Sequence, residues 1–240
     1  MSEREYLAPR WGSSGLVVID MQVDFAEGGA SPIPGTAGVV PGVAELLGAY
    51  RRARLPIVHA IRLYVPGSGD VDPPRRALIE SGASIVAPGT AGAGIVTGLT
   101  PPTVELDTEV LLDGRTQEVG PDEVVMFKPR WGAFYRTGLE GWLRGRGVDT
   151  VVVAGCNLPN CPRATLFEAS ERDFRTVVVP DAVSQSTPER VADLELIGVR
   201  AVPLVEALAA LAGTTSERAV PEPASREHVP MSGATGGVRG

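Results

Sequence analysis

The stretch from Thr150 to Phe174, TVVVAGCNLPNCPRATLFEASERDF, predicts a buried strand that passes almost at once into a helix. Its apolar run, Val151 to Val153, is typical of a strand covered on both faces of a parallel sheet. A proline in the first turn and the apolar spacing that follows predict a helix beginning near Asn160 and Cys161. Such a unit fits a parallel sheet with covering helices, and it places Cys161 at the turn.

Cys161 has two interpretations. A helix N-terminus offers unpaired N–H groups and the positive end of a dipole, and both favour thiolate over thiol. However, a lone cysteine beside a core strand is more often a packing residue. The position alone therefore does not decide between a nucleophile and a core side chain.

Asp20 and Lys128 also end apolar runs, in GLVVIDMQVDF and VVMFKPRWGAF. Ligands of open α/β sheets gather beyond the carboxyl ends of the strands, where a catalytic acid would be placed. Lysine is rarely buried unless it is paired, and Asp20 would be its partner. Taken singly, Asp20 would be read as a turn residue and Lys128 as a surface side chain.

Together, the segments IDMQVDF, KPRWGAFYRTGL and GCNLPNCPRATLFEASERDF resemble the isochorismatase-like cysteine hydrolases. This family includes nicotinamidases, carbamoyl amidases and isochorismate hydrolases. The resemblance spans about residues 14 to 205. It implies a three-layer α/β/α, Rossmann-like domain with a central, mostly parallel sheet, which acts as a hydrolase without a cofactor.

The resemblance assigns Asp20, Lys128 and Cys161 as a catalytic triad. It implies a cis peptide bond between Cys156 and Asn157. It also implies an oxyanion hole formed by the backbone N–H groups of Asn157 and Cys161.

The motifs also suggest a substrate pocket. Phe25, Trp131 and Phe134 would line it near the thiol, and Asn157 and Asn160 would add polar groups. Each of these side chains has an alternative place in the core.

Arg62 and Tyr64 stand at the end of the second predicted strand, where metal-dependent nicotinamidases carry an Asp and a His. Their presence argues against a metal and against a pyridine-carboxamide substrate. They would either contact a polar substrate or form a surface ion pair and a packed aromatic. The two histidines, His59 and His228, do not complete a metal site with the cysteines.

The turn GCNLPNCPR looks like that of a subgroup that includes streptothricin hydrolase, and this ranks a small amide or lactam first as substrate. A carbamoyl compound ranks second and isochorismate third. Relatives often carry a small residue and threonine where Asn157 and Leu158 stand, and serine at Gly132, which leaves the substrate open. The rivals are a non-catalytic binding relative and a dinucleotide oxidoreductase, but no GxGxxG follows the first strand.

A net charge of −7 and the lack of a basic cluster argue against nucleic acid and acidic membranes as partners. No apolar run approaches the ~20 residues of a membrane helix, and the start lacks a signal-peptide layout. We therefore expect a cytoplasmic protein. The resemblance adds a homodimer or larger homo-oligomer.

Alternating strands and helices predict one parallel-sheet domain over residues 14–212. Residues 1–13 are expected to form a flexible arm, and the polar composition of residues 213–240 predicts a disordered tail. Glu27 to Gly42 is rich in Gly and Pro and predicts a long loop, followed by a helix over Val43 to Arg54. A short helix is also expected over Ala93 to Leu99.

Overall fold

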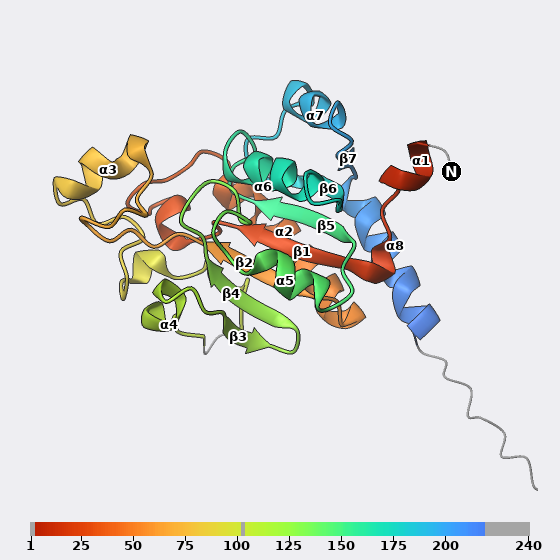
Figure 1. The fold of residues 1–240 in the computed structure, drawn as a ribbon, viewed down its shortest axis with the longest axis horizontal. Helices are drawn as coiled ribbons and strands as arrows, with labels where there is room; N and C mark the ends of the chain where they lie inside the picture. The colour runs from red at the N-terminus through yellow and green to blue at the C-terminus, as the bar shows by residue number, and fades with distance from the viewer. Residues whose placement is uncertain (1–2, 102–103, 219–240) are drawn as a thin grey trace, which may run out of the picture.

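The fold is built on a mostly parallel sheet of seven strands, in the order β3-β4-β2-β1-β5-β6-β7 (Figure 1). The computed structural model describes residues 3–101 and 104–218. Only the β3–β4 pair is antiparallel, and the other neighbouring pairs are parallel. The strands are β1 (Ser14–Ile19), β2 (Ile57–Ile61), β3 (Gln117–Gly120), β4 (Glu123–Phe127), β5 (Thr150–Gly155), β6 (Arg175–Val183) and β7 (Arg200–Ala201).

Helices cover both faces of this sheet. Successive strand side chains point to opposite faces, so Leu16 and Val18 join one core while Val17 and Ile19 join the other. The first core includes α2 (Thr36–Ala53) and α8 (Leu204–Arg218). The second includes α5 (Leu139–Arg144), α6 (Cys161–Ser170) and α7 (Pro188–Glu195). The predicted three-layer α/β/α architecture is confirmed.

The remaining helices are short, and two of them each add one buried residue, Ile79 and Leu111, to the first core. They are α1 (Glu3–Leu7), α3 (Pro73–Glu80) and α4 (Thr108–Leu112), with 3-10 turns η1 (Trp11–Ser13), η2 (Val23–Phe25) and η3 (Ala91–Ala93). Figure 1 shows α3 on the side to which the arrowheads of β1 and β5 point, beyond the carboxyl ends of the parallel strands.

Two local predictions were wrong. Helix α2 begins at Thr36 and runs through Pro41, so part of the expected loop over Glu27 to Gly42 is helical. Packing explains this, because Val39 and Val40 contact the core and Gly42 lies close to the Asp181 carbonyl. Conversely, the helix expected over Ala93 to Leu99 does not form, and only Ala93 of this segment belongs to the turn η3.

The chain ends also differ from expectation. Residues 3–13, expected as a flexible arm, contact the domain: the Arg10 N–H donates to Thr150 Oγ1 at 3.1 Å, and Arg10 Nη1 pairs with Asp149 at 3.1 Å. Helix α8 continues to Arg218, past the expected start of the tail at 213. Residues 219–240 of that predicted tail lie outside the described residues. In the described part of the chain, no helix has the length and apolar character needed to cross a membrane.

Candidate active site

Asp20 follows directly after β1 and is buried. Its φ of +50° lies in the left-handed region, which non-glycine residues seldom adopt. Its N–H donates to the Ala60 carbonyl at 2.9 Å, so the neighbouring strand β2 holds this conformation. Strained residues of this kind cluster at functional sites, and the strain here fixes the direction of a buried carboxylate.

Lys128 follows β4 and lies beside Asp20. Lys128 Nζ is 2.9 Å from Asp20 Oδ2 and donates to the Arg130 carbonyl at 3.3 Å, and its side chain is fully buried. Asp20 Oδ1 has no hydrogen-bond partner within residues 3–101 and 104–218. The pair is therefore electrostatically compensated, yet one carboxylate oxygen stays available as a proton acceptor.

Cys161 is the first residue of α6 and shares a pocket with Asp20. Cys161 is only 4% exposed, and this burial raises the pKa of its thiol to about 11. The neighbouring Asp20 carboxylate also raises the pKa, whereas Lys128 and Arg62 lower it. Desolvation therefore favours the thiol and opposes the thiolate form that the helix N-terminus was expected to favour.

The turn between β5 and α6 brings the backbone close to Asp20. Gly155 has a φ of +113°, and a Cβ atom there would overlap the Ile19 backbone. The peptide bond between Cys156 and Asn157 is cis. The Leu158 N–H donates to the Ser184 carbonyl at 2.9 Å and the Asn160 N–H to the Asn157 carbonyl at 3.0 Å. These two N–H groups are engaged, and the Asn157 and Cys161 N–H groups remain the predicted oxyanion donors.

The pocket around the thiol is small, at about 280 Å³ including its open mouth. Its lining includes Phe25, Trp131, Asn157 and Asn160, all named from the sequence as pocket residues. A larger hollow of about 950 Å³, lined by Thr90, Ile95 and Leu106 among others, contains none of the predicted catalytic side chains.

Phe134 was wrongly predicted to line this pocket. It is buried in the core beneath α5 and α6, where its ring lies 5.7 Å from that of Phe174. Its N–H donates to Glu168 at 2.9 Å. The loop after Lys128 thus turns Trp131 toward the pocket and Phe134 toward the core.

Arg62 and Tyr64 both line the pocket and are buried, so a surface ion pair is ruled out for Arg62. Arg62 Nη1 lies 2.7 Å from Asp72 Oδ2, and Arg62 Nη2 lies 3.8 Å from Cys161 Sγ. The guanidinium also lies 5.2 Å from the Trp131 ring centroid. Tyr64 Oη donates to the same Asp72 oxygen at 3.1 Å.

Three residues of the site were not foreseen from the sequence: Asp72, Ile33 and Arg75. Asp72 is fully buried and compensates Arg62, while Ile33 and Arg75 line the pocket. The only signal for Asp72 is its place before Pro73, which is typical of a helix start. That signal marks a cap and carries no information about an ion pair.

The site does not suit a metal ion. Within the described residues, no group of three or more His, Cys, Asp and Glu side chains could hold one. Arg62 brings a positive charge to the end of β2, and it already engages Asp72. A cation would meet repulsion from this guanidinium.

The groups gathered here are a thiol, a carboxylate with an unbonded oxygen and two buried cations. Such a set can activate a cysteine for attack on a carbonyl carbon, because a nucleophile needs an adjacent base and its developing charge needs stabilisation.

The sequence of the chain is similar to those of known amidohydrolases and of a related protein named as inactive. The chain is 33% identical to a probable inactive nicotinamidase of Arabidopsis thaliana, with 83% of this chain and 97% of that protein covered. It is 28% identical to a ureidoacrylate amidohydrolase of Methylobacterium radiotolerans, covering 72% of this chain and 68% of that protein.

Among solved structures, an isochorismatase family protein from Desulfovibrio vulgaris is similar, with a TM-score of 0.71 and 34% identity. That match covers 83% of this chain and 98% of the other. The Isochorismatase domain family itself matches residues 14–204. The chain, with its aspartate and lysine directly after β1 and β4 and its cysteine at the start of α6, therefore belongs to the isochorismatase family.

Proposed function

We propose that the protein is a cysteine-dependent hydrolase that cleaves a carbon–nitrogen amide bond of a small molecule through a thioester. The observation that carries this proposal is the pocket in which Cys161 and Asp20 meet while Lys128 holds the other oxygen of Asp20. The remaining oxygen, Asp20 Oδ1, is not engaged by Lys128 and can accept the proton of the thiol.

The first step is nucleophilic attack. Since burial raises the pKa of Cys161 to about 11, the thiol gives up its proton only as its sulfur approaches the carbonyl carbon. Asp20 accepts that proton, while Lys128 and Arg62 stabilise the negative charge that develops on sulfur. A carbon–sulfur bond forms, and the carbonyl oxygen becomes an oxyanion.

The second step expels the amine. The Asn157 and Cys161 N–H groups are the proposed donors to the oxyanion, a type of contact whose loss typically costs about 10²–10³ in rate. Asp20 returns its proton to the amide nitrogen, the carbon–nitrogen bond breaks, and a thioester remains on Cys161. Water then loses a proton to Asp20 and adds to the thioester, which releases the acid and restores the thiol.

The pocket favours a small substrate. The enclosed space within it, about 20 Å³, is far below the ~300–1,000 Å³ usual for drug-sized ligands. Open-chain amides and carbamoyl compounds therefore rank first, and the relative named as a ureidoacrylate amidohydrolase supports the carbamoyl class. A cyclic amide such as streptothricin, which the turn sequence suggests, ranks second. Isochorismate ranks last, because its vinyl ether requires a different reaction.

The test is a turnover screen, read by mass spectrometry, against open-chain amides, carbamoyl compounds and lactams including streptothricin. The wild type should add one water to at least one class, and Cys161→Ser should lose this activity while keeping its free energy of unfolding. Equal turnover by Cys161→Ser would overturn the mechanism. If no class reacts, the protein is a non-catalytic relative, as the name of the Arabidopsis protein suggests for that relative.

A further inference from the structure

We propose that the pocket selects small amides that carry a negative charge, and that Arg75 binds this charge. The proposal rests on the proposed function and goes further, because it names the chemical class of the substrate. It begins from the charges that line the pocket.

Arg75 reaches the pocket from α3, which lies beyond the carboxyl ends of the strands (Figure 1). Its guanidinium lies 5.9 Å from the Phe25 ring centroid, and its Nη1 donates to Ser31 Oγ at 3.0 Å. Its backbone N–H donates to the Asp72 carbonyl at 2.8 Å. These contacts hold a half-buried guanidinium at the wall of the pocket.

The other charges of the site are paired. Lys128 pairs with Asp20 at 2.9 Å, and Arg62 pairs with Asp72 at 2.7 Å. Within the described residues, the side chain of Arg75 contacts only neutral groups, the Ser31 hydroxyl and the Phe25 ring, and it takes part in no ion pair. The site therefore carries one uncompensated positive charge, although the whole chain has a net charge of −7.

Arg75 is better suited than Arg62 to bind an anionic group of the substrate. Arg62 is buried, paired with Asp72 and directed at the attacked region, with Nη2 3.8 Å from Cys161 Sγ. Arg75 uses one nitrogen on Ser31, and its remaining donors match a carboxylate, which arginine binds in a planar, bidentate fashion. A substrate would thus place its amide at Cys161 and its acid at Arg75.

The same arrangement discriminates by charge. A cationic amide would meet Arg75 without compensation, and a neutral amide would leave the guanidinium partly desolvated and unpaired. Hydrogen bonds to charged groups contribute roughly ten- to a hundredfold in affinity. We therefore expect preference in the order anionic, neutral, cationic for amides of equal size.

Binding to the Cys161→Ala variant tests this independently of turnover. Calorimetric titrations would use malonamate, succinamate and glutaramate, each paired with its neutral diamide, and 4-aminobutanamide as the cationic member. At least one acid should bind tenfold or more tightly than its diamide. The length of the acid that binds most tightly indicates the spacing between Cys161 and Arg75.

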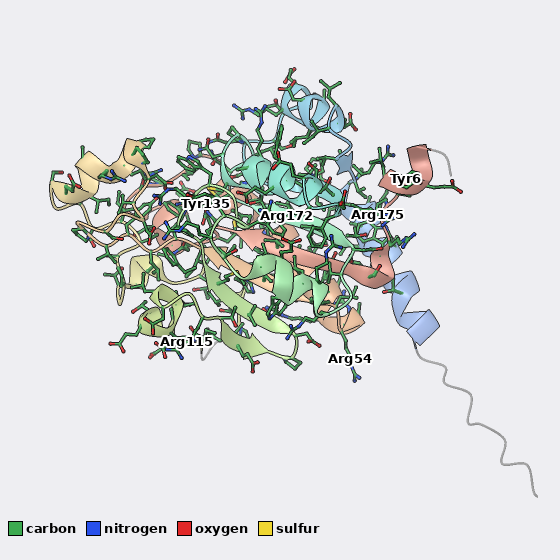
Figure 2. All side chains as sticks on the ribbon, in the orientation of Figure 1. Tyr6, Arg54, Arg115, Tyr135, Arg172 and Arg175 are labelled. Carbon is green, nitrogen blue, oxygen red and sulfur yellow. The ribbon has the colours of Figure 1, made fainter. Side chains whose placement is uncertain are left out.

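Arg75→Gln in the same background should weaken binding of the preferred acid by roughly ten- to a hundredfold and alter the diamide by less than twofold. Arg75→Lys should retain part of the preference. Arg115→Gln is the matched control, because Arg115 is an exposed side chain on the loop between α4 and β3, away from α3 (Figure 2). It removes the same charge from the chain and should leave all affinities unchanged.

Equal affinity for acid and diamide, including no binding of either, would overturn the proposal, as would an equal loss for both in Arg75→Gln. A different result would contradict the proposed function and leave the binding proposal intact. In that case the acid binds Cys161→Ala selectively, but the wild type releases no ammonia from it.

Discussion

Arg62 Nη2 lies 3.8 Å from Cys161 Sγ, and Arg62 Nη1 lies 2.7 Å from Asp72 Oδ2. One buried guanidinium therefore connects the proposed nucleophile to a buried carboxylate. Because Arg62 lowers the pKa of Cys161 against the effect of burial, its removal has two separable consequences.

Arg62→Met should leave Asp72 buried without a counter-charge, which typically costs about 3–5 kcal/mol in the free energy of unfolding. It should also raise the pKa of Cys161 further and slow alkylation of this thiol by iodoacetamide. Urea unfolding measures the first effect, and mass spectrometry of alkylation against pH measures the second.

The double variant Arg62→Met/Asp72→Asn separates the two effects. It removes the unpaired carboxylate, so most of the lost stability should return, while alkylation of Cys161 should remain slow. If stability and alkylation recover together, Arg62 acts on the thiol only through the fold.

Asp20→Asn should change alkylation and turnover in opposite directions. The Asp20 carboxylate raises the pKa of Cys161, so its neutralisation lowers this pKa and increases the thiolate fraction between neutral pH and about 11. Alkylation at pH 8 should be faster than in the wild type. Turnover should fall by about 10²–10⁴, the usual contribution of a general acid–base group.

The control for Asp20→Asn is Asp113→Asn, which removes the same charge from an exposed pair with Arg115. It should alter neither rate. A parallel fall of alkylation and turnover in Asp20→Asn would mean that Asp20 only supports the fold.

Gly132→Ser should destabilise this chain. A Cβ atom at Gly132 would overlap the Glu168 carboxylate, which accepts the Phe134 N–H at 2.9 Å. Displacing Glu168 would cost about 1–3 kcal/mol, the usual penalty for a buried donor left unsatisfied. Chemical denaturation measures this loss.

In a Glu168→Ser background the serine at position 132 has room, so Gly132→Ser should lower the free energy of unfolding by less. The double-mutant cycle gives the coupling energy between the two positions. Gly138→Ser is the control, because no atom lies within 4 Å of a Cβ at Gly138. Additive costs at positions 132 and 168 would contradict the steric explanation.

The strand ends were predictable from the sequence, and the side chains that fill the pocket were only partly so. Asp20, Lys128 and Cys161 follow apolar runs, and the parallel strands β4, β2, β1 and β5 all end at one edge of the sheet, so topology brings the three residues to that edge. Trp131 and Phe134 belong to one short loop, and only packing against α6 decides which of them faces the pocket.

The charges on the far side of the pocket depend even more on tertiary packing. Arg75 and Asp72 reach the site only because α3 folds back over the strand ends. No local pattern encodes this contact, since both residues have the sequence context of an ordinary solvated helix start. The burial of Cys161 likewise depends on the completed fold, which is why its raised pKa was not foreseen.

Glu123 should make the fold sensitive to acid. Its carboxylate lies 2.7 Å from Arg51 Nη2 and from His59 Nε2. Burial raises the pKa of Glu123, but the hydrogen bonds from Arg51 and His59 outweigh it and lower the pKa from 4.5 to about 2. As the pH falls, Glu123 of the unfolded chain is therefore protonated near pH 4.5, whereas Glu123 of the folded chain is protonated only near pH 2. This contribution to stability is complete above pH 4.5 and is lost as the pH falls toward 2.

Glu123→Gln should lower the free energy of unfolding by about 1–3 kcal/mol at neutral pH. The free energy of unfolding of this variant should decline less steeply in acid than that of the wild type, as measured by urea unfolding at each pH. Glu118→Gln, on the exposed side of β3, should keep the wild-type slope, and an unchanged slope in Glu123→Gln would assign the acid sensitivity to another group.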